Sequence, residues 1–308
     1  MTNNNSAPSY AAILEADQTL EGQAIRTPLI ESFALNEKLG SRLFLKCEML
    51  QHTGSFKFRG AYNAISKLNS EQRKNGVFAY SSGNHAQGIA LAAKLLGTHA
   101  TILMPEDTPA IKVSNTKGYG GTVVTYNRYA ESREEIGAKI ASDQNLTLIK
   151  PYDNVDVISG QGTVGLEVAR QLEDLNTTAD IIVAPCGGGG LLSGISLAMS
   201  SLSPNTAIFS AEPENFDDTA RSLALKSRVA NSGDHRSICD AIVTPMPGEI
   251  TFPIMSSFVS SGLVVTDEEV KDAMRTAFQY FKVVIEPGGA VALAALLTGK
   301  VDIKNKTA

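Results

Sequence analysis

Long hydrophobic runs are missing from this sequence, and no apolar stretch approaches the roughly 20 residues that a membrane-spanning helix needs. The polar opening MTNNNSAPSY also lacks the charged and then apolar pattern of a secretory signal. A surplus of positive charge is missing too, since the formal net charge is -5 at pH 7. These absences argue against a membrane protein, a secreted protein and a nucleic-acid-binding protein. We therefore expect a cytoplasmic protein that binds a small molecule.

Cysteine and histidine are scarce. The three cysteines, Cys47, Cys186 and Cys239, have no short spacing, and the four histidines are scattered. Neither a disulfide framework nor a zinc site is indicated. We expect the cysteines to be buried and to pack as small hydrophobic residues do.

What the sequence does contain is a regular alternation of strand and helix patterns. With 308 residues, 43% of them hydrophobic and 19% charged, the chain can bury a core for one large or two moderate domains. The alternation from Gly76 onward predicts parallel sheets in an α/β protein. Strands are expected at 42–47, 77–80, 100–104, 122–126, 181–184 and 207–211. Helices are expected at 9–21, 56–68, 83–96, 109–117, 130–142, 164–172, 267–281 and 290–297, and a less regular polar region at 212–236.

Four consecutive glycines, Gly187 to Gly190, stand between the apolar run 181–183 and a helix-like run that starts at Leu191. Glycine lets successive backbone N–H groups turn inward, and a helix start adds unpaired donors and a positive dipole end. The stretch is a candidate phosphate-binding loop, although a flexible turn has the same composition. The GxGxxG spacing fails at Leu192 or Ser193 and no Lys-Ser or Lys-Thr pair follows, so neither a dinucleotide site nor a P-loop is indicated. A monophosphate cofactor such as pyridoxal phosphate fits, and it needs a lysine for its aldehyde.

Lys57 is the candidate for that lysine. It lies in TGSFKFRG (53–60), near the predicted start of a helix, and Phe56 and Phe58 flank it. Apolar neighbours and a helix start lower the pKa of an amine and favour the neutral nucleophile that attacks an aldehyde. A single lysine is far more often a solvated surface residue, so Lys57 alone leaves the assignment open.

Two further polar stretches follow predicted strands, at the edge where open parallel sheets bind their ligands. SSGNHAQG (81–88) opens a predicted helix, where amides and hydroxyls can hold a carboxylate. An ordinary capping turn is the alternative, and its His85 could be a base or a packed side chain. The second stretch crowds four carboxylates into one loop, which can coordinate a hard cation or simply be solvated: Glu212, Glu214, Asp217 and Asp218.

Together these motifs resemble those of the fold-type II pyridoxal-phosphate enzymes, specifically the threonine/serine dehydratase and serine racemase group. The match runs along nearly the whole chain and includes GSFKFRGA (54–61), SSGNHAQG (81–88), TKGYGG (116–121), SGQGT (159–163), CGGGGLLSG (186–194), AEP (211–213) and EPGGAVALAAL (286–296). The resemblance implies a tryptophan synthase β-like fold of two open, mostly parallel twisted sheets with helices on both faces. It also implies a large cofactor domain, 1–68 plus 150–308, and a small mobile domain, 69–149, with the active site in the cleft.

The resemblance also assigns roles in binding the cofactor. Lys57 would bind the aldehyde of pyridoxal phosphate, and Asn84 would contact its ring hydroxyl. Ser82 would lie on the opposite face of the ring, as a second acid or base. The phosphate would be held by Gly187, Gly188, Gly189, Gly190 and Leu191.

Substrate and metal contacts are implied in the same way. The substrate carboxylate would be bound by Ser81, Ser82, Asn84, His85 and Gln161. Arg133 matches a residue near the domain boundary of the family. A divalent cation such as Mg2+ would be bound by Glu212, Asp218 and the carbonyl of Phe216.

The implied activity is α,β-elimination from a hydroxyamino acid, with L-threonine or L-serine as the favoured substrate and a 2-oxo acid and ammonia as products. Serine racemization and threo-3-hydroxyaspartate dehydration stay open, because relatives with those activities share the motifs. The loop 237–252 places Pro245 where racemases tend to have a hydroxyl, which favours elimination. β-Replacement is disfavoured, since the lysine of cysteine synthases is usually followed by Asp-Arg. A homodimer or homotetramer is implied.

A catalytically impaired, truncated cofactor-binding protein is the alternative from a different class. Relatives continue past the equivalent of Ala308 into a strand and an SGGN-like loop whose hydroxyl or thiol contacts the ring nitrogen, whereas this sequence stops at KNKTA. The C-terminal regulatory domain of biosynthetic threonine dehydratases is not in the sequence either, so we expect no inhibition by isoleucine.

Overall fold

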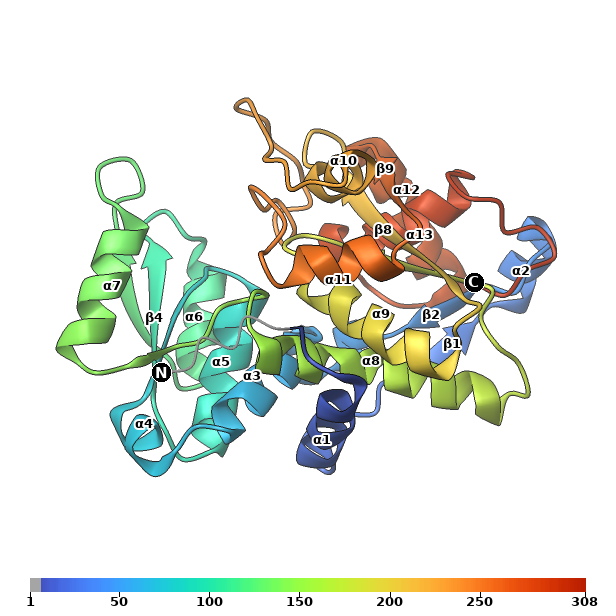
Figure 1. Ribbon diagram of the computed structural model, residues 1–308. Helices are drawn as coiled ribbons and strands as arrows, with labels where there is room; N and C mark the ends of the chain where they lie inside the picture. Colours follow the sequence, from blue (N-terminus) through green and yellow to red (C-terminus); the bar gives the residue numbers. More distant parts are fainter. Residues whose placement is uncertain (1–6) are drawn as a thin grey trace.

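A four-stranded parallel sheet occupies one side of the computed structural model, which describes residues 7–308 (left in Figure 1). Its order is β5-β4-β3-β6, with strands Val77–Tyr80 (β3), Ala100–Pro105 (β4), Thr122–Tyr126 (β5) and Thr147–Leu148 (β6). Side chains of β3 and β4 enter a separate apolar cluster on each face, which explains their uninterrupted apolar runs. The surrounding helices are Ser70–Asn75 (α4), Asn84–Leu95 (α5), Ala110–Gly118 (α6) and Arg133–Asp143 (α7).

A three-stranded parallel sheet, in the order β7-β8-β9, forms the other side. Its strands are Ile181–Pro185 (β7), Ala207–Pro213 (β8) and Ser261–Val265 (β9). Helices Asp267–Thr276 (α12) and Pro287–Leu297 (α13) pack on one face of this sheet. Helices Gly190–Leu202 (α9) and Thr251–Phe258 (α11) pack on the other face, and Asp218–Leu225 (α10) follows β8.

Two antiparallel strands, Leu29–Glu31 (β1) and Phe44–Lys46 (β2), flank the helix Phe33–Leu39 (α2). The last residues of the chain hydrogen-bond to β2 and to β7. Phe44 N–H donates to the Ala308 carbonyl at 2.8 Å, and Ile181 N–H donates to the Thr307 carbonyl at 3.2 Å. These bonds join the two-stranded and three-stranded sheets.

Three helices, Tyr10–Leu20 (α1), Lys57–Ser66 (α3) and Val155–Asp174 (α8), lie between the two sides of the molecule (Figure 1). Glycines let α8 approach both α3 and α9 closely. A Cβ built on Gly160 of α8 would lie 2.6 Å from Gly60 Cα of α3, and one on Gly194 of α9 would lie 2.5 Å from Gly162 N of α8. The 3-10 turns Glu48–Leu50 (η1) and His52–Gly54 (η2) lead into α3.

Several predicted elements differ from the structure in extent. α8 begins at Val155 rather than 164, because close packing keeps Gly160 and Gly162 helical although they weaken the helical pattern of the sequence. The region 212–236 is not irregular throughout, since it contains α10. α11 and β9 were not predicted, and the helix expected at 267–281 becomes a π-helix (η3) over Ala277–Phe281.

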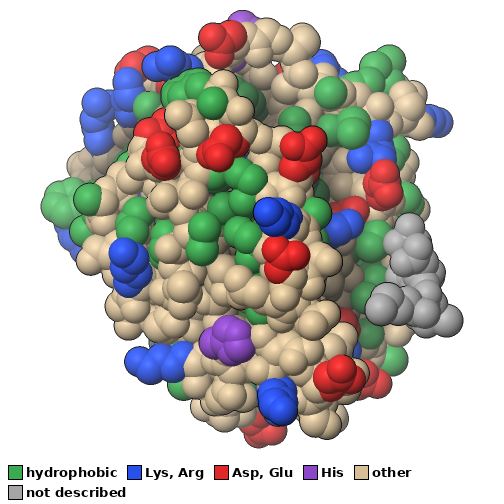
Figure 2. Space-filling model, turned by 90° about the vertical axis from the view of Figure 1, so that its left-hand side faces the viewer, with side chains coloured by type: hydrophobic (Ala, Val, Ile, Leu, Met, Phe, Trp, Pro, Cys, Tyr) green, Lys and Arg blue, Asp and Glu red, His purple; other side chains and the backbone are tan. Residues whose placement is uncertain are grey.

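The predicted parallel α/β architecture is confirmed, as are the buried cysteines, which are all free. No helix within residues 7–308 is long and apolar enough to cross a membrane. On the face shown in Figure 2, acidic and basic side chains are interspersed rather than gathered into one broad basic area.

Candidate active site

A cavity of about 1100 Å³ lies between the two sheets. The carboxyl ends of four parallel strands reach it, through Tyr80, Pro105, Tyr126 and Pro185. Ligands of parallel α/β proteins bind at this edge. The charged side chains that line the cavity are five cations, Lys46, Lys57, Lys112, Arg128 and Arg133, and three carboxylates, Glu48, Asp240 and Glu286. The cationic excess favours an anionic ligand.

Lys57 is the first residue of α3 and lines this cavity. Its Nζ donates to the Pro151 carbonyl at 2.8 Å and lies 5.2 Å from the centre of the Phe56 ring. Burial lowers the pKa of Lys57 to about 8, although the charge of Glu286 opposes this shift. At pH 7 about a tenth of the amine is therefore neutral, far more than for a lysine with the usual pKa, and attack on an aldehyde requires this neutral form.

Gly187 to Gly189 form the turn between β7 and α9, Gly190 begins α9, and all four glycines line the cavity. Gly189 has φ = 92°, which favours glycine, and a Cβ on Gly188 would lie 2.3 Å from the Tyr152 ring. The Gly188 carbonyl accepts from Thr251 Oγ1 at 2.7 Å. α9 has no side chain capping its N-terminus, so its first amides are free to bind a phosphate.

Residues 151 and 152 connect the amine to the glycine turn. Lys57 Nζ contacts the Pro151 carbonyl, and the adjacent Tyr152 packs against Gly188 and Gly190. The predicted amine and the predicted phosphate loop therefore line the same cavity, and each contacts one of the two consecutive residues Pro151 and Tyr152. A single small molecule with an aldehyde and a phosphate fits this arrangement, and pyridoxal phosphate is such a molecule.

The predicted stretch Ser81 to His85 lines the same cavity. Ser81 Oγ accepts from Gly83 N–H at 3.3 Å, and Asn84 Nδ2 donates to Glu286 Oε1 at 2.7 Å. Asn84 is the first residue of α5, and Gly83 before it has no side chain to cap the helix. The start of α5 can therefore bind a carboxylate.

His85 is only 3% exposed, and its Nε2 hydrogen-bonds to the Ile149 carbonyl at 2.9 Å. Burial, together with the charge of Lys57, lowers the pKa of His85 to about 3. The ring is therefore neutral at physiological pH. In this state His85 can contribute a hydrogen bond but no positive charge to a substrate carboxylate.

Gln161 lies apart from the other residues predicted to bind the substrate. Its side chain is 1% exposed between α8 and α3, where Oε1 accepts from Gly60 N–H at 3.2 Å, and it does not line the cavity. The helix crossing at Gly60 and Gly160 holds it there. Its role in binding the substrate carboxylate stays a prediction; in this arrangement Gln161 lies at the contact between the two helices.

The predicted cation-binding residues lie at the end of β8 and the start of α10. Glu212 is fully buried and accepts from the backbone N–H groups of Thr219 and Ala220, while Asp218 Oδ1 accepts from Asn231. Burial raises the pKa of Asp218 to about 6; burial and the charge of Asp218 raise that of Glu212 to about 8. Asp218 Oδ2 is buried and has no hydrogen-bond partner among residues 7–308. An added cation would satisfy this oxygen.

Few ligands are predicted for that cation. No three His, Cys, Asp or Glu side chains gather in a metal-binding arrangement anywhere in residues 7–308. Glu212 and Asp218 provide two carboxylates, and the third predicted ligand is the carbonyl of Phe216. The cation site therefore stays a prediction.

Three residues of the cavity were not singled out by the sequence. Tyr152 packs on the glycine turn, Glu286 accepts from Asn84, and Asp240 accepts from Lys112 Nζ at 2.5 Å. Glu286 begins the motif EPGGA, which could have indicated it. Tyr152 and Asp240 carry no local signal, because their roles depend on partners far away in the chain.

Known proteins are similar to this chain over almost its whole length. The family model for "Pyridoxal-phosphate dependent enzyme" matches residues 20–308. The L-threo-3-hydroxyaspartate ammonia-lyase of Saccharomyces cerevisiae is 44% identical over 97% of this chain and 90% of that protein. The L-threonine ammonia-lyase of Thermotoga maritima is 39% identical over 96% and 72%. The solved structure of maize serine racemase is 38% identical, with a TM-score of 0.91 over 96% of this chain and 88% of that one.

These matches agree with the geometry of the cavity, where an amine and an unblocked helix start face each other. The chain therefore belongs to the fold-type II family of pyridoxal-phosphate-dependent enzymes, among the hydroxyamino acid ammonia-lyases, threonine dehydratases and serine racemases.

Proposed function

We propose that this protein catalyses the α,β-elimination of a hydroxyamino acid to a 2-oxo acid and ammonia. Pyridoxal phosphate, when bound, supplies the electron sink that makes the α-proton acidic. The Lys57 amine would bind the cofactor aldehyde and then accept the α-proton, for which its lowered pKa of about 8 is suited. The glycine turn would bind the phosphate, and residues 81–84 would orient the substrate carboxylate.

The single observation that carries this proposal is the shared cavity of Lys57 and the glycine turn. They are linked through the consecutive residues Pro151 and Tyr152. The test is borohydride reduction of the yellow protein followed by peptide mapping, which should place the reduced cofactor on Lys57. Lys57→Ala should lose both the fixed label and turnover. A label on another lysine would overturn the assignment.

We further propose L-threo-3-hydroxyaspartate as the preferred substrate, ahead of L-serine and L-threonine. Arg133 supports this choice: it lines the cavity, and its guanidinium carbon lies 4.8 Å from the centre of the ring of Tyr80, the residue before Ser81. The ion pair of Arg133 with Glu134 is solvent-exposed, so a ligand carboxylate can compete for the guanidinium. A second carboxylate on the substrate would use this cation.

A substrate panel with matched variants tests this preference. Arg133→Met should lower kcat/KM for hydroxyaspartate about 10- to 100-fold, the value of a charged hydrogen bond, and change that for L-serine less than about threefold. Arg170→Met is the control, because Arg170 pairs with Asp17 between α8 and α1. Equal losses for both substrates would contradict the preference for the second carboxylate.

Racemization is the second candidate activity, since Ser82 lines the same cavity as Lys57. Formation of D-serine from L-serine, measured beside oxo acid release, decides between the two. Ser82→Ala should abolish D-serine formation and leave elimination if Ser82 is the second acid. Bound cofactor with neither product would instead support the cofactor-binding protein without catalysis.

A further inference from the structure

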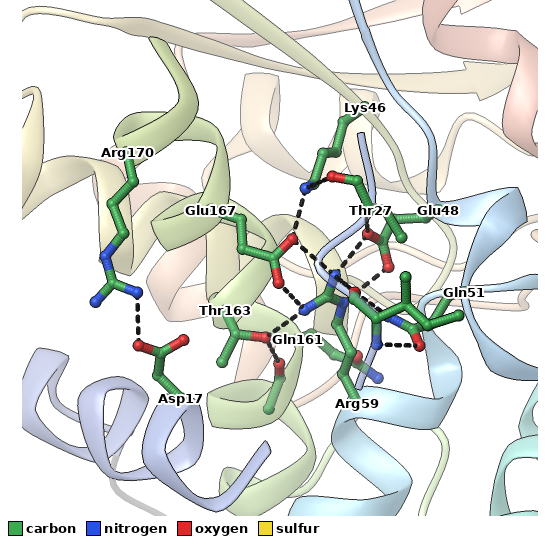
Figure 3. A network of polar contacts seen from close by, with 12 residues as sticks. Asp17, Thr27, Lys46, Glu48, Gln51, Arg59, Gln161, Thr163, Glu167 and Arg170 are labelled. Atoms are coloured by element: carbon green, nitrogen blue, oxygen red, sulfur yellow. Dashed lines mark hydrogen bonds and ion pairs between the residues drawn. The ribbon is translucent and has the colours of Figure 1, made fainter. Parts of the chain in front are cut away.

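A buried network of charged side chains surrounds Arg59, two residues after Lys57 (Figure 3). Arg59 is 1% exposed. Its Nε and Nη2 donate to the two oxygens of Glu48, both at 2.8 Å. Its Nη1 and Nη2 donate to the two oxygens of Glu167, at 2.7 and 3.0 Å. One guanidinium is therefore clamped between two carboxylates, each bound at both oxygens.

The clamp joins four segments of the chain. Glu48 belongs to η1, Glu167 to α8, and Arg59 to α3. The segment before β1 contributes the Ile25 carbonyl, which accepts from Arg59 Nη2 at 3.2 Å. Lys46 Nζ donates to Glu167 at 2.6 Å, so two cations balance two carboxylates. A buried network balanced and hydrogen-bonded in this way permits little adjustment of its members.

The start of α3 needs such a restraint. The first turn has Phe56 at its N-cap and no capping side-chain hydrogen bond. The close approach of Gly60 to Gly160 and the hydrogen bond from Asn63 Nδ2 to the Asp156 carbonyl, at 2.7 Å, hold α3 against α8 further along the helix than its first residue, Lys57. Successive helical positions differ by about 100°, so Lys57 and Arg59 point to nearly opposite sides of α3. Holding Arg59 on one side therefore sets the direction of Lys57 on the other.

We propose that Arg59, clamped by Glu48 and Glu167, is a positioning residue that aims the Lys57 amine into the cavity. The inference rests on the role proposed above for Lys57. Lysine at position 59 would keep the charge but could not bind both carboxylates in a planar fork. The first turn of α3 would then loosen, and water would reach the Lys57 amine more freely.

The experiment measures the reactivity of Lys57 itself. Cofactor-free protein is reductively methylated with formaldehyde and cyanoborohydride across pH 6 to 10, and mass spectrometry gives the rate at Lys57 for the wild type, Arg59→Lys and Glu48→Gln. The wild type should show a midpoint near pH 8. The titratable groups that face this amine, Glu286 and His85, are left unchanged. Both variants should raise the midpoint and slow labelling at pH 8 by about 3- to 10-fold.

A control separates positioning from lost stability. Leu263→Ala creates a cavity in the core beside the three-stranded sheet, away from α3, and should lower the melting temperature without moving the Lys57 profile. A wild-type profile in both network variants would overturn the inference, and Glu48→Gln decides alone if Arg59→Lys does not fold. If the two variants shift the Lys57 profile but the wild-type protein with bound cofactor releases no oxo acid, the positioning role is supported and the proposed activity is rejected.

Discussion

At the scale of single residues, the buried Lys57 amine suits the chemistry but lowers the stability of the folded protein. Its pKa is lowered by burial from 10.5 to about 8. Below pH 8 the folded protein carries a poorly hydrated ammonium, and between pH 8 and 10.5 the unfolded state binds more protons than the folded state. Stability due to this group therefore rises with pH across that window.

Lys57→Met should consequently stabilise the cofactor-free protein at pH 7. We expect a gain of about 1–2 kcal/mol in the free energy of unfolding, after allowance for the water that reaches the side chain through the cavity. The gain should shrink as the pH approaches 10.5. Urea unfolding of both proteins at pH 7 and pH 10 measures it. A variant less stable than the wild type at pH 7 would contradict this reasoning.

The unsatisfied oxygen of Asp218 leads to a second residue-scale prediction. Saturating Mg2+ at about 100 times its dissociation constant should add about 2.7 kcal/mol to the free energy of unfolding, and a chelator should remove the gain. Asp218→Asn should abolish this response. Asp217→Asn is the matched control, because Asp217 pairs with Arg221. Thermal unfolding with and without Mg2+ measures the response of each variant. Equal responses of the two variants would reject the cation site.

At the scale of elements, glycine contacts decide how the central helices cross. Gly160 stands in α8, where a Cβ would lie 2.6 Å from Gly60 Cα and 2.7 Å from the Arg59 carbonyl. Both neighbours are backbone atoms and cannot rotate away. The helices α3 and α8, which carry Lys57 and Glu167, can therefore pack this closely only because position 160 has no side chain.

Gly160→Ala should thus destabilise the protein by about 1–3 kcal/mol, through overpacking, although alanine is the better helix former. Cofactor affinity should fall as well, since α3 would be displaced. Gly118→Ala in α6 is the control, because, within the described part of the chain, no atom outside its own helical turn lies within 4 Å of its added Cβ. We expect this control to be neutral or up to about 1 kcal/mol more stable. Chemical unfolding and cofactor titration of both variants give the two quantities.

Elements differ in how far the sequence predicts them. The apolar strands β3, β4, β7 and β8 were predicted, because each carries its own hydrophobic pattern. β9 was missed: Gly262 weakens its pattern, and a Cβ there would lie 2.3 Å from Ala220 Cβ, so only tertiary packing explains it. The Arg59 network was missed for the same reason, since Glu48 and Glu167 show no local sign of their common partner.

At the scale of the whole molecule, polar contacts span the cavity between the two sheets. Asn84 donates to Glu286, and Lys112 donates to Asp240. Each contact joins the region of the four-stranded sheet to that of the three-stranded sheet. A ligand that binds both walls should therefore stabilise the molecule as a unit. We retain the division into a small mobile domain, 69–149, and a large domain as a proposal.

Pyridoxal phosphate should raise the melting temperature more than pyridoxal does at the same concentration. Pyridoxal keeps the aldehyde for Lys57 but lacks the phosphate for the glycine turn. In Lys57→Ala, the stabilisation by pyridoxal should vanish, whereas part of that by pyridoxal phosphate should persist. Differential scanning calorimetry of the four combinations tests this, and equal shifts by the two compounds would show that the turn does not bind the phosphate.

The distance along the chain between the two walls of the cavity has a consequence for biosynthesis. Lys57 leaves the ribosome well before Gly187 to Gly190, and β8, which pairs with the strand that leads into the glycine turn, follows later still. A nascent chain can therefore meet the coenzyme with its amine alone, at first without an anchor for the anionic end. Stable capture of the coenzyme has to wait until translation has passed the middle of the protein.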